Sequence, residues 1–159
     1  MLGNAAIIIK ITQDEIFAQQ KAWGDGIVAI GAAKDHKKAA IEHINKLYGY
    51  DIGPVLFKPT KAAIIEFRDT KEEALSYFVG GKEPEDDGFA LAPFTKVRFD
   101  NKGIIINCDS ALAMGNYYFT KTDGQEIKVD YSFGYVEDKE GHLKIILHHS
   151  SLPYKPEAK

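Results

Sequence analysis

The sequence is poor in the features that cross-link a chain or anchor it in a membrane. Its 159 residues include one cysteine, which excludes an internal disulfide and favours a reducing compartment. No apolar run approaches the roughly 18 residues of a membrane-spanning helix. A net charge of -3 gives no electrostatic reason to expect a nucleic-acid or membrane partner. We expect a cytoplasmic protein or, if a transit peptide has been removed, a plastid one.

The sequence also lacks the residue spacings that hold a catalytic metal ion. A catalytic zinc site uses three protein ligands and an open position for water. The five histidines form no His-x-His pair, and there is no cysteine cluster or His-Glu-x-x-His segment. His148 and His149 are adjacent in a strand-like run, where they point to opposite faces and do not bind one ion together. We therefore expect no metal cofactor, with zinc or manganese as the alternative.

The first half of the chain carries helical signals. Thr12-Gln-Asp-Glu15 is a capping box, in which a hydroxyl at the N-cap is followed three residues later by a carboxylate. Further helices are expected over residues 33–47 and 69–78. The apolar residues after the capping box recur at spacings that place them on one helical face: Ile16, Trp23, Ile27 and Ile30.

The second half carries strand signals, over residues 95–99, 104–109, 111–120, 126–135 and 143–150. Turn segments such as 100–103 separate several of these runs. Helices followed by antiparallel strands predict one α+β domain over residues 1–159, with its core at about 12–153. In this arrangement the N-terminal helices pack on a curved, mostly antiparallel sheet and close it into a cone-shaped α+β barrel around a pocket.

The last predicted strand ends in two imidazoles and two hydroxyls. Because successive side chains of a strand alternate between faces, His149 shares a face with Ser151, and His148 shares the other face with Ser150. Within each pair, a base and a hydroxyl lie roughly 6.5–7 Å apart along the strand. Such a pair suits a small site at the mouth of a cavity.

This order of elements resembles the nuclear transport factor 2-like fold over nearly the whole chain. The ending Leu147-His-His-Ser-Ser-Leu-Pro153 is similar to that of the calcium/calmodulin-dependent protein kinase II association domain, as are Phe57-Lys-Pro-Thr60 and Ala74-Leu-Ser-Tyr-Phe78. The iota-class carbonic anhydrases share this ending and an early segment like Trp23-Gly24. The resemblance implies reversible hydration of CO2 to bicarbonate, which part of that family performs without a metal.

The resemblance also implies roles for individual residues. Thr60 and Tyr77 match the family's functional threonine and tyrosine, and the last strand supplies a histidine and a serine. In the kinase association domain the position that matches His149 faces the cavity. We therefore expect His149 as general base and Ser151 beside it, with His148 and Ser150 as the alternative pair. Thr60, Tyr77 and Ser151 would orient water and bicarbonate in an apolar pocket whose lining includes Phe57 and Leu147.

Two other functions fit the same fold. One is a non-catalytic module for oligomerisation or small-ligand binding, as in the kinase association domain. The other is an isomerase or dehydratase acting on a larger substrate, although Asp130 lies on the strand face opposite Tyr131 and offers His149 no partner. Apolar residues on both faces of the sheet further predict a homodimer.

Overall fold

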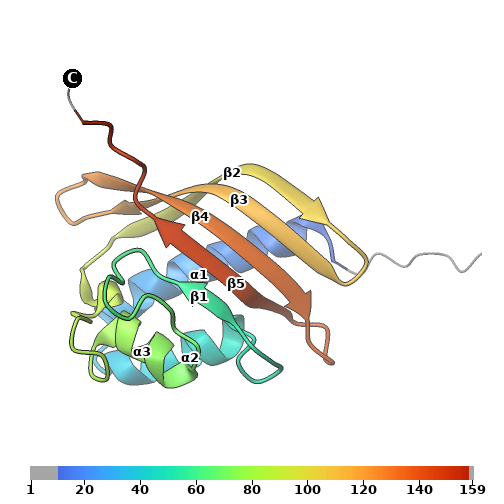
Figure 1. Ribbon diagram of the computed structural model, residues 1–159, viewed down its shortest axis with the longest axis horizontal. Coiled ribbons are helices and arrows are strands. Elements are labelled where there is room, and N and C mark those ends of the chain that lie inside the picture. The colour runs from blue at the N-terminus through green and yellow to red at the C-terminus, as the bar shows by residue number, and fades with distance from the viewer. Residues whose placement is uncertain (1–10, 158–159) are drawn as a thin grey trace, which may run out of the picture.

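Helices lie on one side of a curved sheet (Figure 1). The computed structural model describes residues 11–157. Helices followed by strands confirm the predicted α+β class. In chain order the elements are α1 (Gln13–Ala32), α2 (His36–Leu47), β1 (Leu56–Lys58), α3 (Lys71–Val79), the 3-10 helix η1 (Phe89–Leu91), β2 (Lys96–Ile106), β3 (Ser110–Thr120), β4 (Glu126–Glu137) and β5 (Leu143–Ser151).

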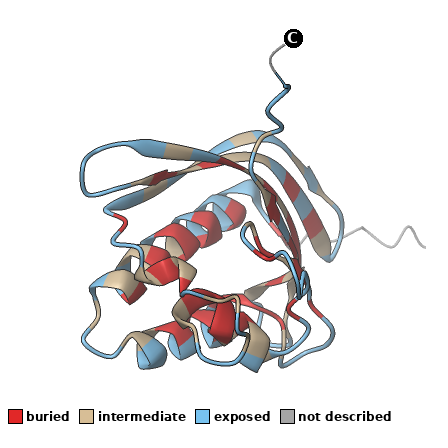
Figure 2. Ribbon diagram, turned by 60° about the vertical axis from the view of Figure 1, so that its left-hand side comes forward, coloured by how far each residue is buried: buried red, intermediate tan, exposed pale blue. Residues whose placement is uncertain are grey.

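The sheet has the strand order β1-β5-β4-β3-β2. The short β1 pairs in parallel with β5, whereas the other neighbours are antiparallel. The sheet curves without closing, because β1 and β2 form its two edges, so the expected barrel is an open cone. Figure 2 shows buried residues on the sheet and helix surfaces that face each other, and the core lies between these layers.

Helix α1 begins at the predicted capping box. The backbone N–H of Thr12 donates to the Glu15 carboxylate at 2.7 Å, and the N–H of Glu15 donates to the Thr12 hydroxyl at 3.2 Å. The predicted apolar face is buried, Trp23 included. Gly26 lets α2 approach closely, because a Cβ atom at this position would lie 2.1 Å from Nδ1 of His43.

Strand β2 corrects one sequence prediction. Residues 100–103 were expected to form a turn, but β2 runs through them and pairs with β3 along its length. Within the Asp100-Asn-Lys-Gly103 segment, the pairing of β2 with β3 shifts register between Asn101 and Gly103. A bulge of this kind accommodates an extra residue without ending the strand.

A second bulge decides which residues of β5 face the core. Gly134 pairs with Leu147 while Tyr135 pairs with Ile145, so Ile146 is an extra residue in β5. After Ile145, the next side chain that points into the core is therefore that of His148 and not that of Leu147.

The predicted inward orientation of His149 and Ser151 is consequently wrong. His148 and Ser150 are buried, whereas His149 is exposed and Ser151 is half-buried. Leu147, expected in the pocket, packs on the outer face, where its Cβ lies 2.9 Å from the position of a Cβ added at Gly134. The extra residue in the strand is the physical reason for all three corrections.

Candidate active site

A small cavity lies between the inner face of β5, α3 and the loop of residues 59–70 that joins β1 to α3. The volume within which the centre of a water molecule could lie is about 10 Å³, which is about what one water needs. The cavity therefore suits a molecule of very few atoms. Its wall combines aromatic rings with a few polar groups: Trp23, Phe57, Pro59, Thr60, Tyr77, Phe78, Phe89, Tyr117, His148 and Ser150.

His148 projects from β5 into an aromatic cage. Its ring stacks on Phe57 at a centroid distance of 4.7 Å and meets Phe133 edge-on at 4.4 Å. Nδ1 lies 2.9 Å from the Tyr48 hydroxyl, and Nε2 lies 3.2 Å from the Tyr117 hydroxyl. Burial lowers the pKa of His148 well below its usual range, and the nearby imidazoles lower it further. His148 is therefore a neutral imidazole near pH 7.

A chain of hydroxyl groups continues from His148 to the cavity. The Ser150 hydroxyl is hydrogen-bonded to both Tyr117 and Thr60. Burial raises the pKa of Tyr117, and the hydrogen bond with Ser150 offsets only part of that rise. Tyr117 thus keeps its phenolic proton. The chain from the imidazole to Thr60 consists of neutral groups.

Parallel pairing of β1 with β5 brings Thr60 to this chain. Lys58 is opposite His149 in the ladder, so the residue two positions beyond Lys58 comes level with the end of β5. Pro59 is buried in the cavity wall, and Thr60 follows it. The short β1 therefore places a hydroxyl that is 90 residues away in sequence beside Ser150.

Tyr77 contributes an unused hydrogen-bond donor. Its ring comes from the buried face of α3, meets Phe57 edge-on at 5.9 Å and stacks on Phe89 at 5.3 Å. The buried hydroxyl has no hydrogen-bond partner among the residues that the structure describes. Burial raises the pKa of Tyr77, while the nearby Lys61 backbone and Thr60 hydroxyl counter part of the rise. Tyr77 is therefore a neutral phenol at the cavity.

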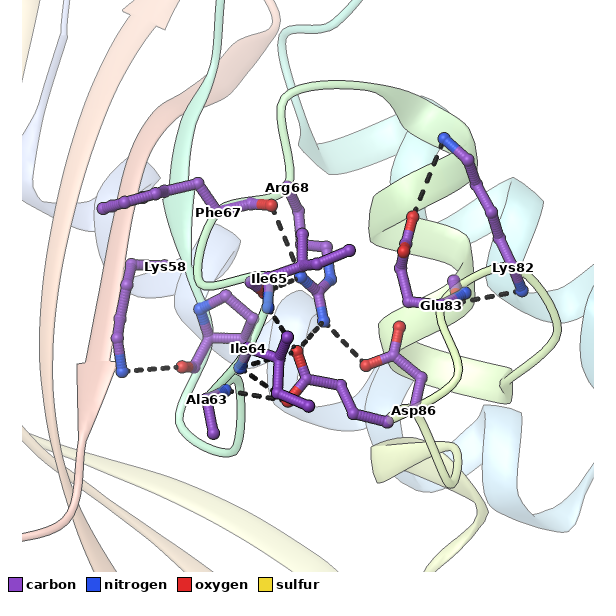
Figure 3. A network of polar contacts seen from close by, with 12 residues as sticks. Lys58, Ala63, Ile64, Ile65, Phe67, Arg68, Lys82, Glu83 and Asp86 are labelled. Atoms are coloured by element: carbon purple, nitrogen blue, oxygen red, sulfur yellow. Dashed lines mark hydrogen bonds and ion pairs between the residues drawn. The ribbon is translucent and has the colours of Figure 1, made fainter.

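A buried ion pair holds the loop that carries Thr60 (Figure 3). The fully buried Arg68 side chain reaches from this loop to the segment after α3, where Nη2 lies 2.7 Å from Oδ1 of Asp86. The carboxylate of Glu85 accepts hydrogen bonds of 2.7–3.1 Å from three consecutive backbone N–H groups, those of residues 63–65. These bonds, the one from Ile65 foremost, lower the pKa of Glu85. The loop bearing Thr60 is thus tied to the segment that follows the helix bearing Tyr77.

Possible metal ligands gather elsewhere in the described residues. Asp138, Glu140 and His142 lie close enough together in the turn between β4 and β5 to share an ion. The Asp138 carboxylate accepts hydrogen bonds from the backbone N–H groups of Glu140 and His142, so this cluster has a role in the turn itself. None of the three residues lines the cavity.

The structure brings together some of the residues singled out in the sequence and separates others. Phe57, Thr60 and Tyr77 line the cavity, and the alternative pair of β5 joins them in place of His149 and Ser151. Sequence reasoning missed Tyr48 and Tyr117. The signal for Tyr117 was its position two residues before the buried Phe119, which places both side chains on the inner face of β3. Tyr48 follows α2 and carried no comparable signal.

Three kinds of comparison point to the same family. The family model described as metal-independent carbonic anhydrase matches residues 14–152. A metal-independent carbonic anhydrase from Nostoc sp. (strain PCC 7120) is 46% identical over 154 residues, which cover 91% of this chain and 75% of the relative. The helices of residues 11–157 include none that is long and apolar enough to cross a membrane.

Solved structures agree with these sequence matches. The crystal structure of a cyanobacterial iota-carbonic anhydrase complexed with bicarbonate is 42% identical, has a TM-score of 0.89 and covers 98% of this chain and 100% of its own. A nuclear transport factor 2-like protein from Pseudomonas putida KT2440, with 18% identity, shares the fold with a TM-score of 0.59, over 91% of this chain and 89% of its own. The chain therefore belongs to the metal-independent carbonic anhydrase family, whose members catalyse the reversible hydration of CO2 to bicarbonate.

Proposed function

We propose that this carbonic anhydrase hydrates CO2 in the cavity described above, with Thr60, Tyr77 and Ser150 around the reacting atoms and His148 behind them. The observation that carries the proposal is the gathering of neutral hydroxyl groups at a small space walled by aromatic rings. CO2 is uncharged and apolar, so rings such as Phe57 are an adequate receptor for it. The bicarbonate bound by the cyanobacterial iota-carbonic anhydrase supports the same ligand here.

Neither histidine of β5 suits the role of general base in this cavity. His149 is exposed on the outer face, away from the cavity. His148 is inside, but both of its ring nitrogens already contact tyrosine hydroxyls. Its protonation would place a cation among aromatic side chains, with no carboxylate beside it in residues 11–157, and burial disfavours that charge. His148 therefore serves as a positioning residue.

A relay through Thr60 provides the proton transfer without any ionised side chain. As the water oxygen bonds to the CO2 carbon, the breaking O–H bond of the water passes its proton to Oγ1 of Thr60. The hydroxyl of Thr60 passes its own proton to a CO2 oxygen, and the product is carbonic acid, which ionises to bicarbonate on release. Tyr77 donates a hydrogen bond to the oxygen on which negative charge grows. Ser150 holds Thr60 in place.

The size of the cavity argues against the isomerase or dehydratase alternative. A ring-sized substrate needs far more room than this enclosed space, whose wall consists mostly of packed aromatic side chains. A wider hollow of about 420 Å³ adjoins the cavity and shares Tyr77 and Phe89 with it. This hollow is the approach for CO2 and the exit for bicarbonate, and the stacked rings of these two residues separate it from the reacting atoms.

Catalysis by neutral hydroxyl groups predicts that chelation leaves activity intact. The initial rate of CO2 hydration, measured by stopped flow after exhaustive dialysis against EDTA, should equal that of the untreated enzyme. A zinc-dependent carbonic anhydrase treated in parallel is the control, and it should lose its activity. Loss of activity in the present enzyme, with recovery on adding zinc or manganese, would contradict the proposed mechanism.

We further propose that the outer face of the sheet forms a homodimer interface. Three large apolar side chains share this face on adjacent strands, and about half or more of each is exposed: Ile105, Leu112 and Met114. Leu147, turned outward by the bulge in β5, extends the same apolar surface across Gly134. A second copy presents the same apolar surface, so a two-fold pairing would cover both.

Met114→Lys should therefore convert the dimer to a monomer, because a charge would be placed on the apolar face. Sedimentation velocity at micromolar concentration measures the change. Lys128→Met is a control on the same sheet, because it removes an exposed charge instead of introducing one. A wild-type protein that sediments as a monomer at this concentration would overturn the dimer proposal.

A further inference from the structure

We infer that Tyr48, oriented by Trp23, fixes His148 in the tautomer that carries its proton on Nε2, and so leaves the hydroxyl hydrogen of Thr60 free for the substrate. The inference deepens the proposed relay and rests on it for its catalytic consequence. It makes Tyr48 a positioning residue that acts through His148 from the side remote from the substrate. The inference is argued from the direction of each hydrogen bond in the continuous chain of side chains from Trp23 to Thr60.

The chain begins with a group that has only one possible role. The indole nitrogen of Trp23 lies 2.9 Å from the Tyr48 hydroxyl, and an indole N–H is always a donor. The Tyr48 oxygen therefore accepts from Trp23. Its own hydrogen has one acceptor within reach among the described residues, Nδ1 of His148 at 2.9 Å. Tyr48 therefore donates to Nδ1, which must be unprotonated.

The state of Nδ1 sets every later bond in the chain. A neutral imidazole without a proton on Nδ1 carries it on Nε2, which donates to the Tyr117 oxygen. Tyr117 then donates to Ser150, and Ser150 donates to Thr60. Thr60 is the end of the chain and lines the cavity, so its hydrogen points to the substrate. In this direction each donor from Trp23 to Ser150 has an acceptor, and only the hydrogen of Thr60 is left for the substrate.

The opposite tautomer would undo this arrangement. With the proton on Nδ1, His148 would donate to Tyr48, whose oxygen would then accept twice while its buried hydrogen had no acceptor. Nε2 would accept from Tyr117, so Ser150 would lose its donor, and Thr60 would be free to turn its hydrogen toward Ser150. The relay needs that hydrogen for a CO2 oxygen. A buried donor without an acceptor is destabilising, which favours the Nε2 tautomer.

Packing keeps Tyr48 in this position. Its side chain is fully buried, and its ring lies on that of Tyr50 at a centroid distance of 6.1 Å with an interplanar angle of 22°. Burial also raises the pKa of Tyr48 well above its usual value, so the hydroxyl keeps the hydrogen that it donates. Trp23 itself meets the His148 ring edge-on at 5.5 Å. Trp23, Tyr48 and His148 thus pack together as one buried group.

The tautomer is measured directly by NMR. In protein labelled with ¹⁵N-histidine, long-range ¹H–¹⁵N correlations separate the N–H nitrogen of a neutral imidazole from the nitrogen that accepts a hydrogen bond. The His148 signals are assigned by their loss in His148→Gln. Near pH 7, wild-type protein should show Nε2 protonated and Nδ1 unprotonated. Protonation of Nδ1 alone, or of both nitrogens, would overturn the inference, and this test requires no variant of Tyr48 to fold.

Tyr48→Phe supplies the second test. Without its donor, Nδ1 loses the reason to stay unprotonated, so the Nδ1–H tautomer should appear and kcat should fall about tenfold, the equivalent of one ordinary hydrogen bond. Tyr50→Phe is the matched control, because this tyrosine stacks on Tyr48 but donates its hydroxyl to the Arg68 carbonyl oxygen at 2.6 Å. It should leave the His148 tautomer unchanged. An unchanged tautomer in Tyr48→Phe would also contradict the inference.

Failure of the relay and failure of the tautomer assignment give different results. If Ser150→Ala and Thr60→Val remain fully active while wild-type His148 shows the Nε2 tautomer, the proposed relay is wrong and the tautomer assignment stands. If both variants are inactive while wild-type His148 is protonated on Nδ1, the relay stands and the role of Tyr48 is wrong. The NMR spectra therefore test the tautomer, and the hydration assay tests the relay independently.

Discussion

Ser150→Ala should lower kcat for CO2 hydration by at least about 10²-fold, the usual cost of removing one oriented donor from a reaction centre. The variant breaks the chain at its middle, because the Ser150 hydroxyl is the group that joins Tyr117 to Thr60. Thr60 would keep its place in the loop but lose the partner that orients it. Stopped-flow hydration assays measure the loss.

The same strand contains the matched control for this prediction. Ser151→Ala removes an identical hydroxyl one residue further along β5, on the opposite face of the sheet. It should leave the hydration rate unchanged, and both variants should keep the wild-type far-UV circular dichroism and thermal midpoint to within a few degrees. A large loss of activity in Ser151→Ala with a small one in Ser150→Ala would contradict the assignment of Ser150, and not Ser151, to the inner face of β5.

Arg68→Met should destabilise the protein by about 3–5 kcal/mol, as expected when one partner of a buried ion pair is removed. The Arg68 side chain is fully buried and that of Asp86 is 3% exposed, so the carboxylate would stay in the interior without its counter-ion. Backbone carbonyl oxygens of Ile65 and Phe67 would also lose the guanidinium donor. Urea unfolding followed by circular dichroism gives the free energy of unfolding.

Two further variants test the physical cause of that loss. Arg98→Met removes a guanidinium that pairs with Glu126 at 2.9 Å, but both side chains are 41% exposed, so this variant should unfold close to the wild type. The double variant Arg68→Met/Asp86→Leu should recover much of the stability, because neither charge is left buried alone. A double variant less stable than Arg68→Met would contradict the explanation by an unpaired charge.

Local signals in the sequence predict most of the elements. The Thr12 capping box marks the start of α1, and alternation from Val129 to Tyr135 identifies the inner face of β4. These patterns depend on neighbouring residues alone, so one sequence is enough to read them. The turn expected at residues 100–103 was wrong, because pairing with β3 over both flanks outweighs the local turn preference.

The candidate site was less predictable, because it depends on contacts between residues distant in sequence. Alternation left both histidine–serine pairs open and the resemblance to the kinase association domain favoured His149, whereas only pairing with β4 reveals that Ile146 is an extra residue. The link from Tyr48 to His148 spans 100 residues, and nothing in the segment around Tyr48 indicates it. Arg68 gave no sign that its charge would be buried, because arginine is usually exposed.

The bulge at Ile146 makes the chemistry of this chain sensitive to strand length. Deleting that single residue would restore regular pleating and reverse which side chains at the end of β5 face the interior. The imidazole of His149 and the alcohol of Ser151 would then point inward. Related sequences should therefore be aligned by counting residues back from the position of Pro153 to that of the buried Ile145. A homologue shorter by one in this interval should have its inward-facing histidine and serine assigned afresh.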